Sequence, residues 1–186
     1  STVGIIGNIG SGKSSILDII SRLYDPSEGS IKLDGVDMKE YTLDQIRENI
    51  GYIPQNAFLF SESIEDNIRF GSINASKEEI QKATKHAKVH DNIIGFKEGY
   101  KTLLGERGVT LSGGQIQRIS IARGLIKKPN ILLLDDCLSA VDTDTEEEIL
   151  KHLKIATKNK TTIIVSHRIS SVRHADLIIV LENGQI

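Results

Sequence analysis

The sequence predicts an α/β fold in which a mainly parallel sheet is flanked by helices. Three stretches of the 186-residue chain, 131–134 (ILLL), 161–166 (TTIIVS) and 177–181 (LIIVL), are apolar along nearly their whole length. Such runs are typical of strands that are buried on both faces, as in a parallel sheet. Stretches with helical periodicity separate the strand candidates, and this alternation indicates helices layered on a sheet.

The elements follow from local patterns in chain order. Strands are expected at 2–6, 30–33, 51–53, 131–134, 161–166 and 177–181, and long helices at 13–24, 76–89, 115–126 and 145–156. In the first helix, an apolar stripe is formed by Ile16, Ile19, Ile20 and Leu23. The second opens with the capping box Ser76–Glu79. The residues LDG at 33–35 predict a turn.

The chain is predicted to form one domain with one insertion. Residues 56–114 contain helical patterns but no convincing strand, so we expect a helical subdomain there, inserted into a core formed by 1–55 and 115–186. The chain begins inside a strand and stops at NGQI, so we expect the domain 1–186 to be truncated at both ends.

Composition narrows the class of protein. Hydrophobic residues make up 39%, charged residues 26%, and the net charge is −2, which is ordinary for a globular domain and unlike the basic footprint of a nucleic-acid binder. The lone Cys137 excludes an internal disulfide and is expected to be a small buried residue. We expect no signal peptide, and no apolar run approaches the ~18 residues that span a bilayer, so membrane contact is expected through a partner.

A glycine-rich loop supplies the first functional motif. Residues 7–15 (GNIGSGKSS) follow a strand, open a helix and match G-x-x-x-x-G-K-[ST]. Such a loop turns backbone N–H groups toward phosphates, while Lys13 adds charge and the Ser14 hydroxyl can ligate Mg²⁺. The residues predicted to bind the nucleotide are Asn8, Ile9, Gly10, Ser11, Gly12, Lys13, Ser14 and Ser15. The sequence therefore predicts a P-loop NTPase that binds a nucleotide with Mg²⁺.

Two aspartates end the apolar run NILLLDD at 130–136. A Mg²⁺ ion that bridges two phosphates needs a second acidic anchor, and in phosphate-loop enzymes an Asp at the end of a neighbouring strand supplies it. Asp135 fits that role, with an acidic cap of a helix or turn as the alternative.

A second anion site is predicted at 111–115 (LSGGQ), where Ser112 is placed to cap a helix and Gly113 and Gly114 allow close approach to the backbone. Two phosphate-binding helix ends with a single phosphate-loop lysine suggest a dimer, in which each subunit covers the other's nucleotide.

Taken together, these motifs resemble the nucleotide-binding domain of an ATP-binding cassette (ABC) transporter along nearly the whole chain. The residues 7–15 are similar to its Walker A motif, 131–136 to Walker B, 111–115 to the family signature and 139–142 (SAVD) to the D-loop. Gln55 falls at the Q-loop glutamine and His167 at the switch histidine.

The resemblance implies ATP sandwiched between two such domains. Gln55 would sense Mg²⁺ as a ligand, His167 would hold the γ-phosphate and the attacking water, and Asp142 would lie at the dimer contact. The residues implied to bind ATP in trans are Leu111, Ser112, Gly113, Gly114 and Gln115. The partner implied is a second nucleotide-binding domain.

Two stretches resemble exporters rather than the family members of DNA repair, chromosome structure or translation, which remain the alternative. Residues 102–108 (TLLGERG) are similar to an exporter-specific loop in which Glu106 would touch the coupling helices of the transmembrane domain. The segment after Gln55 (AFLFSESIEDNI) would receive those helices, although Phe58, Leu59 and Phe60 could instead be core residues. The domain would then act at the cytoplasmic face of a cell membrane.

Asp136 departs from the family pattern, because hydrolysing members have Glu there to polarise the attacking water. A carboxylate withdrawn by about 1 Å can cost on the order of 100-fold in rate, which is roughly 2.7 kcal/mol of barrier. The intact signature beside a weakened base resembles one subunit of an asymmetric, heterodimeric exporter of the multidrug type. A slow homodimer and a tolerated substitution without consequence are the alternatives. The aromatic residue that stacks on adenine in the family lies upstream of this chain, so we expect the isolated piece to bind ATP weakly.

Overall fold

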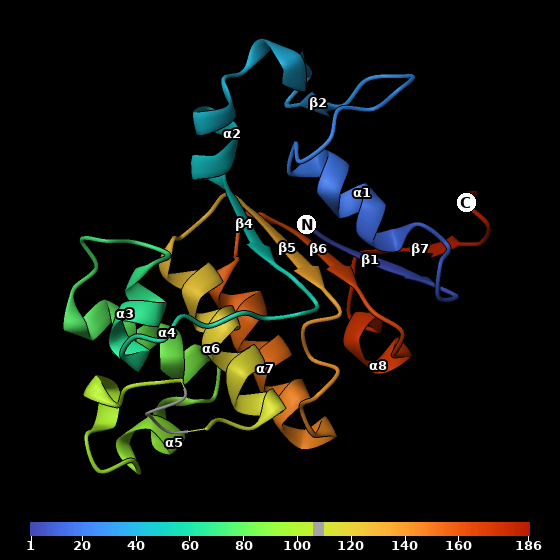
Figure 1. Cartoon of the computed structure of the whole chain (residues 1–186). Coiled ribbons are helices and arrows are strands. Elements are labelled where there is room, and N and C mark those ends of the chain that lie inside the picture. The colour runs from blue at the N-terminus through green and yellow to red at the C-terminus, as the bar shows by residue number, and fades with distance from the viewer. Residues whose placement is uncertain (106–109) are drawn as a thin grey trace. The chain divides into compact units, whose positions relative to one another are not determined.

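A computed structural model describes residues 1–105 and 110–186 of the chain. The chain, whose helices and strands are labelled in Figure 1, divides into two compact units. Unit 1 comprises Ser1–Tyr52, Pro129–Asp135 and Lys160–Ile186, and unit 2 comprises Ile53–Lys128 and Asp136–Asn159.

Unit 1 is built on a five-stranded sheet with the order β4-β5-β6-β1-β7. The strands are β1 (Thr2–Gly7), β4 (Ile50–Ile53), β5 (Ile131–Asp135), β6 (Thr161–Val165) and β7 (Leu177–Leu181). β1 pairs with β6 and β7, and β5 pairs with β6, all in parallel. The predicted α/β fold with a mainly parallel sheet is confirmed.

Helices cover both faces of this sheet, with α1 (Lys13–Ile20) and α8 (Ile169–Val172) on opposite sides in Figure 1. Successive side chains of a strand point to opposite faces. Ile5 accordingly packs with Leu17 of α1 in the core of unit 1, whereas Gly4 faces α8. A Cβ at Gly4 would lie 2.6 Å from Cβ of Val172, so α8 approaches the sheet too closely for a larger residue.

The first helix is shorter than predicted. It ends at Ile20 because Arg22 adopts a left-handed conformation (φ 54°) and the N–H of Leu23 turns back to the carbonyl of Asp18. Leu17 is completely buried, while Leu23, predicted on the apolar stripe, is 55% exposed.

The predicted strand at 30–33 lies outside the main sheet. Only Lys32–Leu33 (β2) is extended, and it pairs antiparallel with Val36–Asp37 (β3). The two residues between them, Asp34 and Gly35, both have positive φ (49° and 86°), as a tight hairpin turn of type I′ requires. A one-turn helix η1 (Met38–Glu40) and helix α2 (Leu43–Asn49) then lead to β4.

Unit 2 is helical. Its elements are α3 (Ile64–Arg69), α4 (Lys77–His86), α5 (His90–Ile94), η2 (Gly99–Lys101), α6 (Gly113–Ile126) and α7 (Thr143–Ala156). Among its described residues, β pairing outside β4 is limited to an isolated bridge between Ser63 and Leu103. The predicted subdomain 56–114 lies inside this unit, which also contains α6 and α7.

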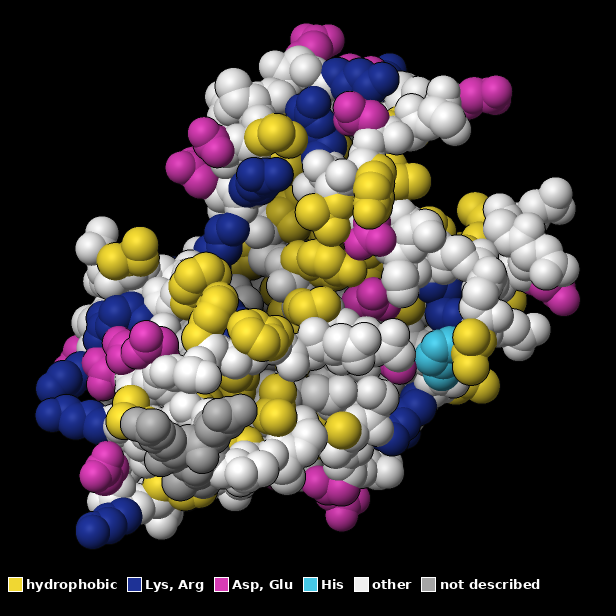
Figure 2. All heavy atoms as spheres, viewed as in Figure 1, with side chains coloured by type: hydrophobic (Ala, Val, Ile, Leu, Met, Phe, Trp, Pro, Cys, Tyr) yellow, Lys and Arg dark blue, Asp and Glu magenta, His cyan; other side chains and the backbone are white. Residues whose placement is uncertain are grey.

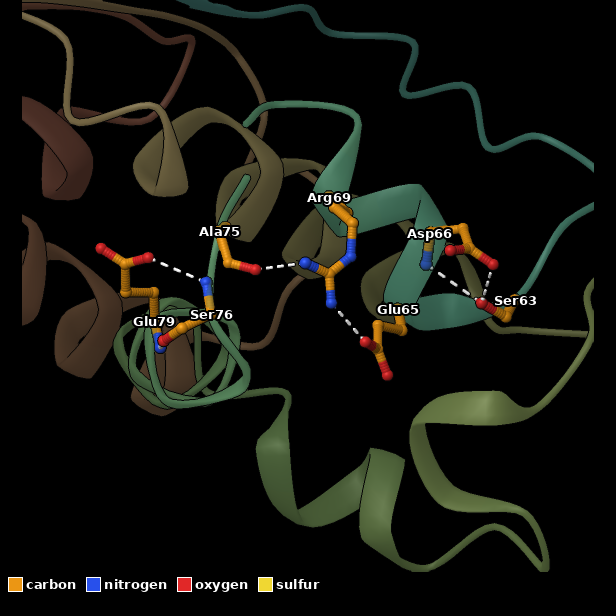
Figure 3. A network of polar contacts seen from close by, with 7 residues as sticks. All are labelled: Ser63, Glu65, Asp66, Arg69, Ala75, Ser76 and Glu79. Atoms are coloured by element: carbon orange, nitrogen blue, oxygen red, sulfur yellow. Dashed lines mark hydrogen bonds and ion pairs between the residues drawn. The ribbon is translucent and has the colours of Figure 1, made fainter. Parts of the chain in front are cut away.

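Side chains fix the connection between α3 and α4, as Figure 3 shows. The hydroxyl of Ser63 accepts from the N–H of Asp66 at 3.0 Å and so caps α3. Arg69, in the last turn of α3, donates to the carboxylate of Glu65 and to the carbonyl of Ala75. This arginine therefore ties the end of α3 to the residue that precedes the cap of α4.

Reciprocal caps start two of the predicted helices. Ser76 and Glu79 form the predicted capping box at α4, with N···O distances of 2.9 and 3.2 Å. Ser112 is the N-cap of α6, as predicted, and Gln115 completes a second capping box. α6 and α7 begin two residues earlier than predicted, at Gly113 and Thr143.

Two sequence-based expectations about single features can also be compared with the structure. Cys137 is buried, with 2% of its surface exposed, as expected of a small apolar residue. In the part of the chain that the structure describes, no helix is both long and apolar enough to cross a membrane.

Candidate nucleotide-binding site

The phosphate loop of unit 1 needs glycine at two positions. Gly12, the residue before α1, has φ 99°, a conformation that L side chains rarely adopt. At Gly7, a Cβ would lie 2.1 Å from the backbone carbonyl oxygen of Leu181 in β7. The loop can therefore curl at the end of β1 only with this glycine spacing.

Lys13 is buried within the loop, with 5% of its surface exposed. Its ammonium donates to the carbonyl oxygens of Gly7 and Asn8 at 2.8 and 2.7 Å, and to Oγ of Ser11 at 3.4 Å. A buried charge held by three oxygens of one loop is fixed where phosphate groups would meet the N-terminus of α1.

Ser14 and Asp135 come together, as the two predicted Mg²⁺ ligands must. Oγ of Ser14 donates to Oδ1 of Asp135 at 3.0 Å, across 121 residues of sequence. One hydroxyl and one carboxylate oxygen fit a cation that takes its remaining ligands from water and phosphate, as Mg²⁺ usually does. The described residues contain no group of three or more His, Cys, Asp or Glu side chains that could hold a metal ion by themselves.

Tyr52 is a residue of this site that the sequence reasoning missed. Its hydroxyl lies 3.3 Å from Oδ2 of Asp135 and 3.2 Å from Oδ1 of Asp18. Burial, together with the charges of Asp135 and Asp18, raises the pKa of Tyr52 well above its ordinary value. The phenol therefore stays neutral, and its single O–H can donate to Oδ1 of Asp18 or to Oδ2 of Asp135. The alternation of side chains along β4 predicts on which face of the sheet Tyr52 lies, but it does not predict the contact with Asp135.

The carboxyl ends of three neighbouring strands carry the predicted groups of unit 1. The phosphate loop follows β1, Asp135 ends β5, and His167 comes two residues after β6, where Val165 pairs with both Ile5 and Asp135. Ligands of parallel α/β sheets bind at this edge. His167 is exposed there.

Gln55 and Asp136, the other two predicted catalytic residues, meet in unit 2. Nε2 of Gln55 lies 3.4 Å from Oδ2 of Asp136, whose side chain is buried (9% exposed). Asp136 has φ 42°, in the left-handed region that Asp adopts more readily than most residues other than glycine. The boundary between the two units falls between Asp135 and Asp136.

The signature residues form the first turn of α6. Oγ of Ser112 accepts from the N–H of Gln115 at 3.3 Å, and Oε1 of Gln115 accepts from the N–H of Ser112 at 2.9 Å. Leu111 is half-buried, and Ser112 and Gly113 are exposed. The exposed start of a 14-residue helix, free of bulky side chains at Gly113 and Gly114, is suited to an anion.

Asp142 also starts a helix. Its carboxylate accepts from the N–H of Thr145 at 3.0 Å and so caps α7, and this bond, with the charge of Arg118, lowers the pKa of Asp142. Glu106, predicted to touch a transmembrane partner, lies outside the described residues.

The segment joining β4 and α3 exposes aromatic side chains, and Figure 2 shows hydrophobic groups gathered along it. Phe58 and Phe60 are 67% and 38% exposed, so they are surface residues rather than core. Arg123 of α6, also missed from the sequence, donates to the carbonyl oxygens of Phe58 and Asn67, each at 2.8 Å. Its guanidinium lies 5.6 and 5.9 Å from the ring centroids of Phe60 and Phe70.

Comparison with known proteins decides the family. The sequence profile described as ABC transporter matches residues 1–139, three quarters of the chain. The chain belongs to the ABC transporter family. Its fold matches that of the nucleotide-binding domain of an ABC exporter.

Relatives of this ABC domain cover the whole chain. It is 47% identical to heavy metal tolerance factor 1 of Caenorhabditis elegans over 100% of this chain and 23% of that protein. It is 45% identical to human ATP-binding cassette sub-family B member 6 over 100% of this chain and 22% of that protein. The solved structure of a bacterial Atm1-family ABC exporter with ATP bound superposes with a TM-score of 0.96 at 43% identity, covering 100% of this chain and 33% of that one. The chain therefore spans about a quarter to a third of the length of these relatives.

Proposed function

We propose that this chain is the ATP-binding and hydrolysing domain of an ABC exporter. The observation that carries the proposal is the pairing of Ser14 with Asp135 at 3.0 Å beside the buried Lys13, in a chain that matches an exporter's nucleotide-binding domain from end to end. Export across a membrane would use transmembrane segments outside this chain, and the domain would work at the cytoplasmic face.

ATP would lie on the phosphate loop with its terminal phosphates at Lys13 and the N-terminus of α1. Ser14 and Asp135 would hold Mg²⁺, with Gln55 as a further ligand, and the ion would neutralise charge that develops on the transferred phosphoryl group. Tyr52 keeps the carboxylate of Asp135 oriented. His167 would contact the γ-phosphate and the attacking water from the end of β6.

The signature turn would complete the site of a second subunit. Gly113 and Gly114 offer backbone N–H groups and Ser112 offers its hydroxyl proton at an exposed helix start, while the N–H groups of Ser112 and Gln115 are held in the capping box. The sequence contains one phosphate-loop motif. A head-to-tail pair of such domains gives each signature turn a nucleotide, with Asp142 at the contact. The aromatic surface at Phe58 and Phe60, supported by Arg123, would receive the coupling helices of the transmembrane part.

The second subunit is proposed to be a different protein. The carboxylate of Asp136 is one methylene shorter than that of glutamate, and a catalytic group set back by about 1 Å can lose on the order of 100-fold in rate. This chain would thus bind Mg·ATP, hydrolyse it slowly, and lend an intact signature to a partner with a stronger base.

A binding experiment tests the core of the proposal. The full-length protein is titrated with a fluorescent ATP analogue in the presence of Mg²⁺, as wild type and as Lys13→Ala. Loss of the loop ammonium should weaken binding at least tenfold, or about 1.4 kcal/mol. The matched control Lys39→Ala removes an exposed lysine of the same unit and should bind like the wild type. Equal binding by Lys13→Ala would contradict the proposed site.

A second experiment tests the asymmetry. The full-length protein is purified alone and together with the candidate second subunit, and steady-state ATP turnover is measured. Little activity alone and restored activity with the partner are expected. Vigorous hydrolysis by the protein alone would contradict the heterodimer and leave ATP binding untouched.

A further inference from the structure

Gln117, a buried polar residue of α6, contacts the segment that follows Asp136. The side chain is 7% exposed, and its Oε1 accepts from the N–H of Ala140 at 2.9 Å. Because a backbone N–H can only donate, this contact fixes which end of the amide is the oxygen. Nε2 then faces Oγ of Ser139 and donates to it at 3.1 Å. Both ends of the amide are thus engaged by two consecutive residues of one turn.

That turn is continuous with Asp136. The N–H of Ser139 donates to the carbonyl oxygen of Asp136 at 3.3 Å, and the N–H of Val141 donates to the carbonyl oxygen of Leu138 at 3.0 Å. Asp136 itself has the left-handed backbone conformation described above. Ser139 is therefore hydrogen-bonded to the backbone of Asp136, whose conformation sets the direction of its carboxylate.

The start of α6 approaches the same turn closely. A Cβ at Gly114 would lie 2.9 Å from the carbonyl oxygen of Ala140, and one at Gly113 would lie 3.6 Å from the Cβ of Ala140. Arg118, one residue after Gln117, donates to the carbonyl oxygen of Gly114 at 3.1 Å and carries a charge near Asp142. The signature turn and the residues 139–142 therefore share a tightly packed contact with Gln117 at its centre.

We propose that Gln117 is a positioning residue that transmits nucleotide engagement at the signature turn to the turn that carries Asp136. The inference rests on the proposed function, because it assumes that Ser112–Gln115 contact the ATP of the second subunit. ATP that draws the first turn of α6 toward it would shift the Gln117 amide, and the amide would carry Ser139 and Ala140 along. One site of the dimer would in this way set the geometry of the base in the other.

A purely structural role for Gln117 makes a different prediction. If the amide only satisfies the buried N–H of Ala140, its removal loosens residues 139–141 equally with and without nucleotide. If the amide transmits nucleotide engagement, its removal reduces the response of that segment to nucleotide by at least half. The quantity to measure is therefore the change in amide hydrogen exchange on nucleotide addition, and not the exchange rate itself.

The experiment uses the full-length protein in its native complex, with Lys13→Ala in this chain so that nucleotide enters only the partner's site. A non-hydrolysable ATP analogue with Mg²⁺ is added, and exchange is followed in the peptides 112–116 and 136–141. Both peptides should be protected when Gln117 is present. Gln117→Met, similar in length but without donor or acceptor, should keep the protection of 112–116 and lose at least half of that at 136–141.

Two further variants make the result specific. Ile126→Val trims a buried side chain near the other end of α6 and should leave both responses in place, whatever it does to stability. Ser139→Ala removes only one of the two contacts and should give an intermediate loss. Equal nucleotide-induced protection of 136–141 in Gln117→Met and in the parent overturns the inference alone. Absence of protection at 112–116 in the parent overturns the proposed signature contact, and the inference with it.

Discussion

At the scale of single residues, Tyr52 has a role that can be isolated. Its phenol supports the carboxylate oxygen of Asp135 that Ser14 does not engage, at 3.3 Å. Tyr52→Phe should lower the apparent Mg²⁺ affinity of nucleotide binding about two- to fivefold, less than the loss of a full hydrogen bond to a charged group, because the single O–H of Tyr52 is shared between Asp135 and Asp18. Titration of Mg²⁺ at fixed ATP analogue measures this directly.

The matched control is Tyr41→Phe, which removes another half-buried hydroxyl of unit 1 whose partner is the carbonyl oxygen of Leu33 at 3.4 Å. This variant should leave the Mg²⁺ dependence unchanged. If both tyrosine variants shift the Mg²⁺ affinity equally, Tyr52 acts through general packing and not through Asp135.

Residues whose role depends on local sequence could be predicted, and those that depend on pairing across the fold could not. Lys13 and Ser14 follow from the spacing of one loop, and the Ser76–Glu79 cap from two residues three apart. Tyr52 and Gln117 reach partners more than 20 residues away in sequence, through strand order and helix packing. Neither contact leaves a periodic signal in the chain.

At the scale of elements, the contact between α4 and α7 contains a titratable pair. The rings of His86 and His152 meet edge to face with centroids 5.6 Å apart, beside the salt bridge between Lys88 and Glu148 at 2.8 Å. Burial, followed by the charges of His152 and Lys82, lowers the pKa of His86. The folded state therefore disfavours the protonated ring.

The sign of the pH effect follows from this shift. The unfolded His86 takes up a proton as the pH falls through its ordinary value of 6.5, whereas the folded one resists it, so stability is lost as the pH drops below that value. Amide exchange in α4 and α7, corrected for intrinsic rates, should quicken between pH 7 and pH 5.5. His86→Phe keeps a ring at the contact and should flatten this dependence. If amide exchange in His86→Phe depended on pH as steeply as in the wild type, the pH dependence would come from groups other than His86.

Arg123 joins α6 to the segment around α3. It hydrogen-bonds the carbonyl oxygens of Phe58 and Asn67 and faces two aromatic rings, and burial lowers its pKa. Arg123→Ala should lower the free energy of unfolding by about 2 kcal/mol, because two carbonyl groups lose a charged donor. Arg123→Lys should still lower the free energy of unfolding, by a smaller amount, since one ammonium cannot reproduce the forked donors of a guanidinium. Thermal unfolding of the full-length protein measures the stability of both variants. Wild-type stability in Arg123→Lys would contradict a role that depends on donation to two carbonyl oxygens at once.

The long elements were predictable because their patterns are strong. The apolar runs of β5, β6 and β7 and the caps of α4 and α6 were placed within two residues. The strand expected at 30–33 was misplaced because two residues of β-like sequence cannot distinguish a central strand from a small hairpin. The end of α1 was missed because Arg22 takes a left-handed turn without glycine.

At the scale of the whole molecule, Asp135, which ends β5, and Asp136, which follows it, have different proposed roles. Asp135 belongs to unit 1 with the phosphate loop, and Asp136 to unit 2 with Gln55 and the signature helix. In the proposed site, Ser14 and Asp135 would hold Mg²⁺ and Asp136 would be the base, so binding and hydrolysis would depend on different carboxylates. A weaker base would then leave nucleotide binding intact, as the proposed asymmetric pair of subunits requires.

The measurement that tests this account most directly is the ATP turnover of the native complex carrying Asp136→Glu in this chain. The longer carboxylate should raise turnover, by up to about 100-fold at this chain's own site. Asp136→Asn is the control, because it keeps a side chain that tolerates the left-handed backbone but removes the charge, and it should not raise turnover. Unchanged turnover with glutamate in place would contradict the claim that the shortened base limits this site.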